Sequence, residues 1–352
     1  MPTRALITGY EDDLKLWPDF WHKVAWFFGL LVFAAFPLMG AWWTTIATLG
    51  FIHIVGALAL MILTGFAGQI SLGHAAFLAI GAYTAAVLGN EFELPFWLLI
   101  PISGAMAALV GLALGPFALR LRGLYLAIVT IGLLFLVNHT LHTIPQTGGV
   151  GGTSVPMYYW FGAEYDVQAL KVGGSFELKL YALFGLMAFF CAMACVNIRR
   201  SNIGRAMFAI RDHDLAAAVL GVKPLKTKLM AFGISSFFAG VAGAMFAFQQ
   251  QYITIEPPFD MNMSVQYIAM IVLGGIGTVF GAVAGALVFT FLTPLAELVG
   301  PFIPLVSELS SAQQSTLIFS LVVCGFLIFE PMGVLGIWLR IKRYFQTWPF
   351  SY

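Results

Sequence analysis

The chain consists largely of long apolar runs, each about as long as a helix that crosses a membrane. Such a helix needs roughly 20 predominantly apolar residues. Only 9% of the 352 residues are charged, whereas about 25% is usual in soluble proteins, so the chain cannot cover the surface of a soluble fold. The sequence therefore predicts an all-α fold, a polytopic transmembrane helical bundle. The clear runs are 24–40, 43–63, 70–89, 96–119, 124–141, 179–197, 229–249 and 314–332.

One further apolar stretch decides the number of spans. Residues 265–297 are too many for one ordinary span, and the glycine-rich segment 274–281 interrupts them. We therefore predict two spans there and about ten in total, with broken helices. An eight-span arrangement, in which 265–297 is one long tilted helix, is the alternative.

The distribution of basic residues predicts the side on which each loop lies. Lys and Arg concentrate in cytoplasmic loops. With the N-terminus inside, 15 of the 17 basic residues lie on the inner side, and only Lys171 and Lys179 lie outside. The net charge of +1 provides no basic field that would attract a nucleic acid. The predicted parts are a cytoplasmic segment 1–23, a transmembrane domain 24–343 with an inner loop 198–228 and an outer loop 142–178, and a cytoplasmic tail 344–352.

Two glycine-rich segments interrupt apolar runs. The first, 64–77, also contains polar side chains, and the second is 273–285. Each glycine weakens a helix by ~1 kcal/mol relative to alanine, and the freed backbone groups must line a cavity or meet polar neighbours. Paired interruptions mark the transport path in many transporters. The candidate path residues are Gly65, Gly68, Gln69, Ser71, His74, Gly274, Gly275 and Gly277.

Tight helix packing is the alternative explanation for these glycines. Gly281 and Gly285 form a GxxxG pattern, as do Gly111 and Gly115. For His74, a structural hydrogen bond to a neighbouring helix is favoured over a proton relay or a substrate contact. No acidic residue lies in the middle of a clear span, which disfavours a proton- or sodium-driven carrier.

The inner loop predicts a short amphipathic helical element at the cytoplasmic face. Ser201 or Asn202 suits the start of a helix. Gly221 suits the position just after its end, and Pro224 follows as a stop signal. Asp212 could instead cap a second short helix, which would bend the element within the sequence RDHD. Docking to a partner and a plain basic surface helix are both consistent with this pattern.

Taken together, four segments resemble the permease subunits of bacterial branched-chain amino acid ABC importers, specifically the M-type subunit for leucine, isoleucine and valine. They cover most of the chain in the expected order. The segments are TGFAGQISLGHAAFLAIGAYTAAVL (64–88), LRLRGLYLAIVTIGL (119–133), GRAMFAIRDHDLAAAVLGVKPLKTKLMAFGISSFFAGVAGAMFA (204–247) and VLGGIGTVFGAVAGALVF (272–289).

The resemblance implies that the inner loop couples this chain to an ATPase. In such permeases the loop carries a pattern related to EAA-x3-G, whose AA and G positions match Ala216, Ala217 and Gly221. Leu215 occupies the Glu position, and Asp214 precedes it. Arg211 and Asp214 are then expected to form a local i,i+3 pair or to face the ATPase. The implied coupling residues are Gly204, Arg205, Arg211, Asp214, Ala216, Ala217 and Gly221.

The resemblance also implies the partners. A related H-type permease would pair with this chain in the bacterial inner (plasma) membrane, among membrane lipids. Two cytoplasmic ATPase subunits would dock below, and a periplasmic substrate-binding protein would deliver the substrate. The chain has no G-x-x-x-x-G-K-[ST], so ATP is expected on the partner subunits and no cofactor on this chain.

We therefore predict a non-enzymatic permease subunit for branched-chain or other hydrophobic amino acids. The alternatives are the same architecture carrying urea or small aromatic or carboxylic acids, and an ATP-independent secondary carrier or facilitator. An intramembrane enzyme is disfavoured because the sequence shows no zinc-type His cluster, no Ser/Lys or paired-Asp constellation and no G-x-S-x-G. Catalytic residues and metal ligands are accordingly not expected.

Overall fold

The computed structural model describes most of the chain, namely residues 33, 36–120, 123–155, 175–299, 311–330 and 332–347. The predicted segment 1–23 and most of the first predicted span therefore lie outside the described residues. The chain divides into two compact units, Met1–Thr45 and Ile46–Tyr352. In the first, the Thr44 hydroxyl donates to the Gly40 carbonyl at 3.0 Å. The second contains all the predicted site residues.

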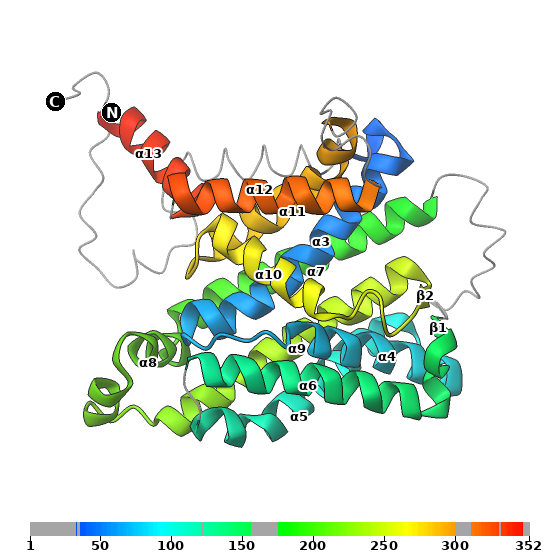
Figure 1. Ribbon diagram of the computed structural model, residues 1–352, viewed down its shortest axis with the longest axis horizontal. Helices are drawn as coiled ribbons and strands as arrows, with labels where there is room; N and C mark the ends of the chain where they lie inside the picture. The colour runs from blue at the N-terminus through cyan, green and yellow to red at the C-terminus, as the bar shows by residue number, and fades with distance from the viewer. Residues whose placement is uncertain are drawn as a thin grey trace. The chain divides into compact units, whose positions relative to one another are not determined.

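The described residues form helices joined by short connections, with one pair of very short strands (Figure 1). The helices are η1 (Phe36–Met39), α3 (Ala41–Leu60), the π-helix η2 (Met61–Phe66), α4 (His74–Phe92), α5 (Phe96–Arg120), α6 (Leu124–Thr143), η3 (Pro145–Thr147), η4 (Gly149–Gly151), α7 (Ser175–Arg200), α8 (Asn202–Val219), α9 (Pro224–Gln250), α10 (Met261–Gly274), α11 (Val279–Val299), α12 (Ser311–Phe329) and α13 (Gly333–Thr347). The strands are β1 (Thr153–Ser154) and β2 (Tyr252–Ile253).

Membrane-spanning helices account for most of this architecture. Within the described ranges, six helices are long and apolar enough to cross a membrane, and a seventh span is added if α10 and α11 together count as one. The chain bends by 119° between those two helices. The predicted all-α membrane fold is thus confirmed, and so is the predicted interruption of 265–297. The predicted total of about ten spans is only approximate, because the described residues provide six or seven.

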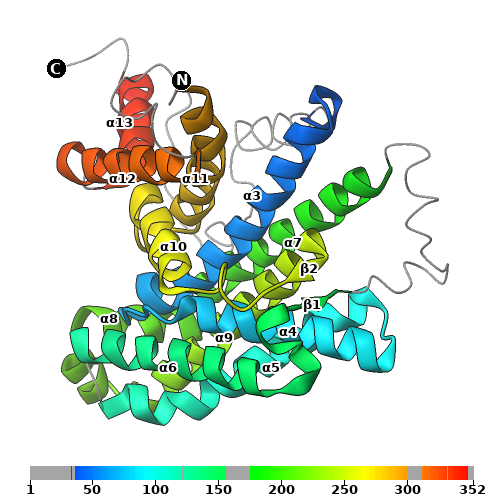
Figure 2. The ribbon, with the colours of Figure 1, turned by 45° about the vertical axis from the view of Figure 1, so that its right-hand side comes forward.

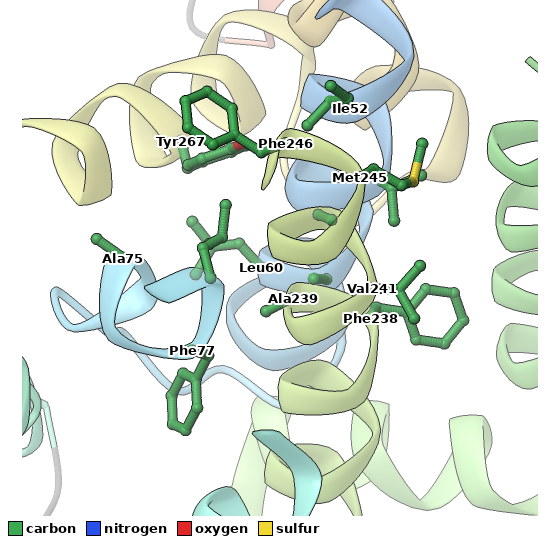
Figure 3. Packing of buried hydrophobic residues seen from close by; sticks show 14 of the residues in the cluster. Ile52, Leu60, Ala75, Phe77, Phe238, Ala239, Val241, Met245, Phe246 and Tyr267 are labelled. Atoms are coloured by element: carbon green, nitrogen blue, oxygen red, sulfur yellow. The ribbon is translucent and has the colours of Figure 1, made fainter. Parts of the chain in front are cut away.

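Glycines allow α4, α5 and α9 to cross at close range. A Cβ atom at Gly81 of α4 would overlap the carbonyl oxygen of Gly240 on α9, and one at Gly243 would overlap the carbonyl oxygen of Leu78. The predicted GxxxG pair on α5 also packs against α9, since Cβ atoms at Gly111 and Gly115 would collide with side chains there. Figure 3 shows buried residues of α3, α4, α9 and α10 converging on one apolar core.

The two ends of the bundle differ in structure (Figures 1 and 2). Helix α8 lies at one end, and the β1–β2 pair lies at the other. At the strand end, Thr153 pairs with Ile253, and the Asn138 side-chain amide donates to Glu256 Oε1 at 2.7 Å and to the Phe259 carbonyl at 3.0 Å. The described parts of the predicted inner and outer loops therefore lie at opposite ends, and residues 156–174 of the outer loop lie outside the described residues. Which end faces the cytoplasm stays a prediction from the charges.

Candidate functional site

The first glycine-rich segment interrupts the helical structure between η2 and α4, and we call this interruption the first break. Gly68 has a φ of +69°, a left-handed conformation that favours glycine. Side chains of other helices satisfy the backbone groups that the break frees. The Leu72 N–H donates to Thr130 Oγ1 of α6 at 3.0 Å, and the Ala75 N–H donates to Ser264 Oγ of α10 at 2.9 Å. The break is thus held from both sides, as backbone away from water requires.

His74 begins α4 directly after this break. Its Nε2 is hydrogen-bonded to the carbonyl of Gly56 on α3 at 3.0 Å, which confirms the predicted structural bond to a neighbouring helix. The imidazole packs edge-on against the Tyr267 ring at a centroid distance of 5.1 Å. Gly56 is required at this contact, because a Cβ there would collide with the same ring. His74 therefore ties α3, α4 and α10 together.

Gln69 and Ser71 lie in the first break with their polar atoms buried and unpaired. Their side chains are 5% and 1% exposed. Neither the Gln69 amide atoms nor the Ser71 hydroxyl has a hydrogen-bond partner among the described residues. A buried polar group without a partner costs about 1–3 kcal/mol. This arrangement therefore leaves polar groups in the first break whose hydrogen-bonding capacity is unmet among the described residues.

The second break separates α10 from α11. Gly275 and Gly277 have φ values of +112° and +89°. Past the break, the Gly281 N–H donates to Thr278 Oγ1 at 3.0 Å in the first turn of α11. Cβ atoms at Gly281 and Gly285 would overlap carbonyl oxygens of the preceding break and of α10. The packing explanation thus holds for the Gly281–Gly285 pair, whereas Gly277 is required for the turn.

The two breaks, which are far apart in sequence, touch each other. The Gly277 N–H donates to the Met61 sulfur in η2 at 3.0 Å. A Cβ at Gly65 would lie 3.1 Å from the Gly277 nitrogen. The two segments that the sequence singles out therefore form one junction.

The start, bend and end of α8 follow the sequence signals. Ser201 caps the helix, since its Oγ accepts from the Gly204 N–H at 3.3 Å. His213 has non-helical φ and ψ values of −154° and 101°, so the helix is kinked within RDHD. Gly221 follows the helix with a φ of +88°, and its N–H donates to the Ala218 carbonyl at 3.0 Å. The predicted cap and the terminal glycine are confirmed, and of the two alternatives for the middle of the element the structure shows the bent one.

Arg211, just before the kink, extends to both breaks. Its Nη1 donates to the Gly65 carbonyl at 2.6 Å. A Cβ at Gly277 would lie 2.8 Å from the same Nη1, and a Cβ at Gly68 would lie 3.0 Å from Arg211 Cγ. The structure thus gives Arg211 a partner across the junction, which the sequence did not indicate.

The segment of α8 after the kink presents an apolar surface to solvent. Ala217 is buried against its own chain, whereas Ala216 beside it is exposed. Leu215, Val219 and Leu220 are also exposed. Reasoning from the sequence named Leu215 only as the residue at the Glu position and missed Val219 and Leu220, although large apolar side chains on a basic surface loop were a usable signal. Large exposed apolar side chains at neighbouring positions are typical of an interaction surface.

Of the remaining predicted coupling residues, Asp214 is half-buried directly after the kink, and Gly204 and Arg205 shape the first turns of α8. Gly204 is buried where a Cβ would overlap the Ile198 carbonyl oxygen at the end of α7. Arg205 donates to Asn202 Oδ1 and, at 3.4 Å, to the Arg200 carbonyl. These contacts connect α8 to α7 and do not extend to the breaks.

Comparison with known proteins identifies related chains. Residues 43–329 match the protein family described as branched-chain amino acid transport system / permease component. The high-affinity branched-chain amino acid transport system permease protein LivM of Escherichia coli strain K12 is 39% identical over 280 residues, which are 73% of this chain and 65% of LivM. LivM of Salmonella typhimurium strain LT2 is 36% identical over 279 residues, 73% of this chain and 64% of LivM. The chain thus spans less than two thirds of the length of these relatives.

A more distant relative is matched over most of its length. LivH of Salmonella typhimurium, also a high-affinity branched-chain amino acid transport system permease protein, is 24% identical over 303 residues, 82% of this chain and 92% of LivH. No solved structure matches the chain.

Proposed function

Because the chain belongs to the family of branched-chain amino acid transport system permease components, we propose that it is one of two membrane subunits of an ABC importer. Its partners in this proposal are a related permease of the LivH type, two cytoplasmic ATPase subunits and a periplasmic substrate-binding protein. The complex resides in the bacterial inner membrane. The proposed substrates are branched-chain amino acids, which the names of the LivM relatives print, or other hydrophobic amino acids.

One observation carries this proposal: the exposed apolar surface of α8 lies at the same end of the bundle as the junction of the two breaks. ATP binding closes the ATPase dimer, the dimer moves α8, and α8 moves the junction. The chain needs no catalytic residue, because the free energy of transport comes from ATP on the partner subunits.

Burial of the predicted path residues supports the proposal, because a closed route would bury them. Seven of the eight predicted path residues are buried, and the eighth, Gly68, is exposed. Gln69 and Ser71 carry the unmet polar groups of the first break. We propose that opening the junction exposes these groups to the ammonium and carboxylate groups of the passing amino acid, while the surrounding apolar residues accommodate its side chain.

The docking assignment predicts that Val219→Glu weakens binding of the ATPase subunits. Val219 is 89% exposed in the apolar surface of α8. A carboxylate there would be desolvated on docking, and losing one well-buried contact costs about 1.4 kcal/mol or more, a tenfold weakening. The measurement is the amount of ATPase that co-purifies with this chain from membranes.

Val150→Glu is the matched control, because Val150 is 87% exposed in the η4 turn at the strand end. It is expected to leave ATPase co-purification unchanged. Full ATPase recovery with Val219→Glu would refute docking at α8. ATP-independent uptake of leucine by the purified chain in vesicles would instead favour a secondary carrier.

A further inference from the structure

We propose that Arg211 is a latch that holds the junction of the two breaks closed, and that movement of α8 withdraws it. This deepens the proposed function and rests on it, since α8 is the element that the ATPases would move. Arg211 is a positioning residue here: it acts on the backbone that forms the closed junction and has no contact with substrate.

The latch begins with a backbone carbonyl at the end of a helix. Gly65 lies in the last turn of η2, where carbonyl groups lack partners within the helix. The Arg211 guanidinium supplies a charged donor at 2.6 Å, and hydrogen bonds from a charged group are stronger than neutral ones. The bond joins residues 146 positions apart. It therefore fixes α8 to the first break.

Two glycines make room for the same side chain. At Gly277 and Gly68, the atoms nearest to an added Cβ belong to Arg211. Both glycines have positive φ values, so the turns that pass around the arginine are ones that other residues rarely adopt. The arginine thus occupies a position defined by both breaks, and its removal frees both.

The latch can be reached from α8 without unfolding the bundle. Arg211 is an exposed residue whose guanidinium contacts the Gly65 carbonyl, while its Cγ lies beside Gly68. The exposed apolar surface begins two residues beyond the kink at His213. A partner that moves the segment after the kink can therefore withdraw the guanidinium through the backbone that connects them.

The test uses Ser71→Cys as a reporter in the full chain, co-expressed with its partner subunits. Ser71 is 1% exposed and its hydroxyl has no partner among the described residues, so the near-isosteric thiol is tolerated and buried while the junction is closed. The rate of labelling by a membrane-impermeant maleimide, applied to inside-out vesicles without ATP, reports opening. The same chain without Ser71→Cys gives the background from Cys191, Cys195 and Cys324.

Arg211→Gln is expected to raise the labelling rate about tenfold, the effect of losing one charge-assisted hydrogen bond. Arg211→Lys keeps a charged donor and is expected to restore part of the protection. Lys226→Gln removes the same charge from an exposed residue in the first turn of α9 and is expected to leave the rate unchanged.

Equal labelling rates in the reporter chain with and without Arg211→Gln would overturn the latch. An equal rise with Lys226→Gln would also overturn it, because the effect would then follow net charge. The labelling needs neither transport nor ATP hydrolysis. If the complex without substitutions showed no ATP-driven leucine uptake, that result would therefore count against the proposed function and not against the latch.

Discussion

Leucine in place of Gly277 is expected to lower ATP-driven uptake at least about tenfold, while the chain still inserts into the membrane and binds its ATPases. Gly277 has a φ of +89°, and a side chain there meets Arg211 Nη1 at 2.8 Å. The left-handed conformation alone costs a non-glycine residue about 1–2 kcal/mol. The leucine would also displace the guanidinium from Gly65. The measurement is leucine uptake into proteoliposomes that contain the complex and ATP.

Gly325→Leu is the control for this prediction. Gly325 lies within α12, and a Cβ there meets nothing within 4 Å. Because Gly277→Leu and Arg211→Gln act on one contact, the double variant is expected to lose little more uptake than Gly277→Leu alone. Additive losses, or normal uptake with Gly277→Leu, would contradict a role for this junction in transport.

Leucine in place of Gly81 is expected to remove the folded chain from the membrane. The backbones of α4 and α9 touch at Gly81 and Gly240, and α5 approaches Gly240 from its other side. A side chain at Gly81 would force the crossing apart, and overpacking on this scale costs at least about 3 kcal/mol. The measurements are the amount of chain recovered from membranes and its melting temperature in detergent.

Gly132→Leu supplies the comparison for helix packing. Gly132 lies in α6, is exposed, and a Cβ there meets nothing within 4 Å. It is expected to give normal recovery and a nearly unchanged melting temperature. Similar melting temperatures for the Gly81 and Gly132 variants would show that the α4–α9 crossing tolerates separation.

Local signals in the sequence predicted local structure well. Ser201 caps α8, Gly221 follows its end, and the RDHD segment bends at His213. Each of these features depends on residues within a few positions of one another, so the residue types determine them directly. The spans and their interruptions were predictable for a similar reason, because lipid requires long apolar helices.

The junction itself was not predictable from the sequence. Met61 and Gly277 are 216 positions apart, and no local pattern indicates that they meet. The motif-based interpretation gave Arg211 only Asp214 or an ATPase as a partner, whereas the structure places its guanidinium on the carbonyl of Gly65, which lies in another element. Every residue carries the same backbone carbonyl, so the residue types do not indicate which carbonyl a side chain contacts. Such a contact is known only once the positions of the helices are known.

The bend at His213 divides α8 into two parts, which under the proposed function have separate tasks. The part before it reaches the breaks, and the part after it carries the outward apolar residues. Selection can therefore act on one part with little consequence for the other. If the proposed docking at α8 holds, a permease acquires a different ATPase by exchanging residues 214–221 and keeps the junction of its two breaks unchanged, so that one membrane scaffold serves several ATPases.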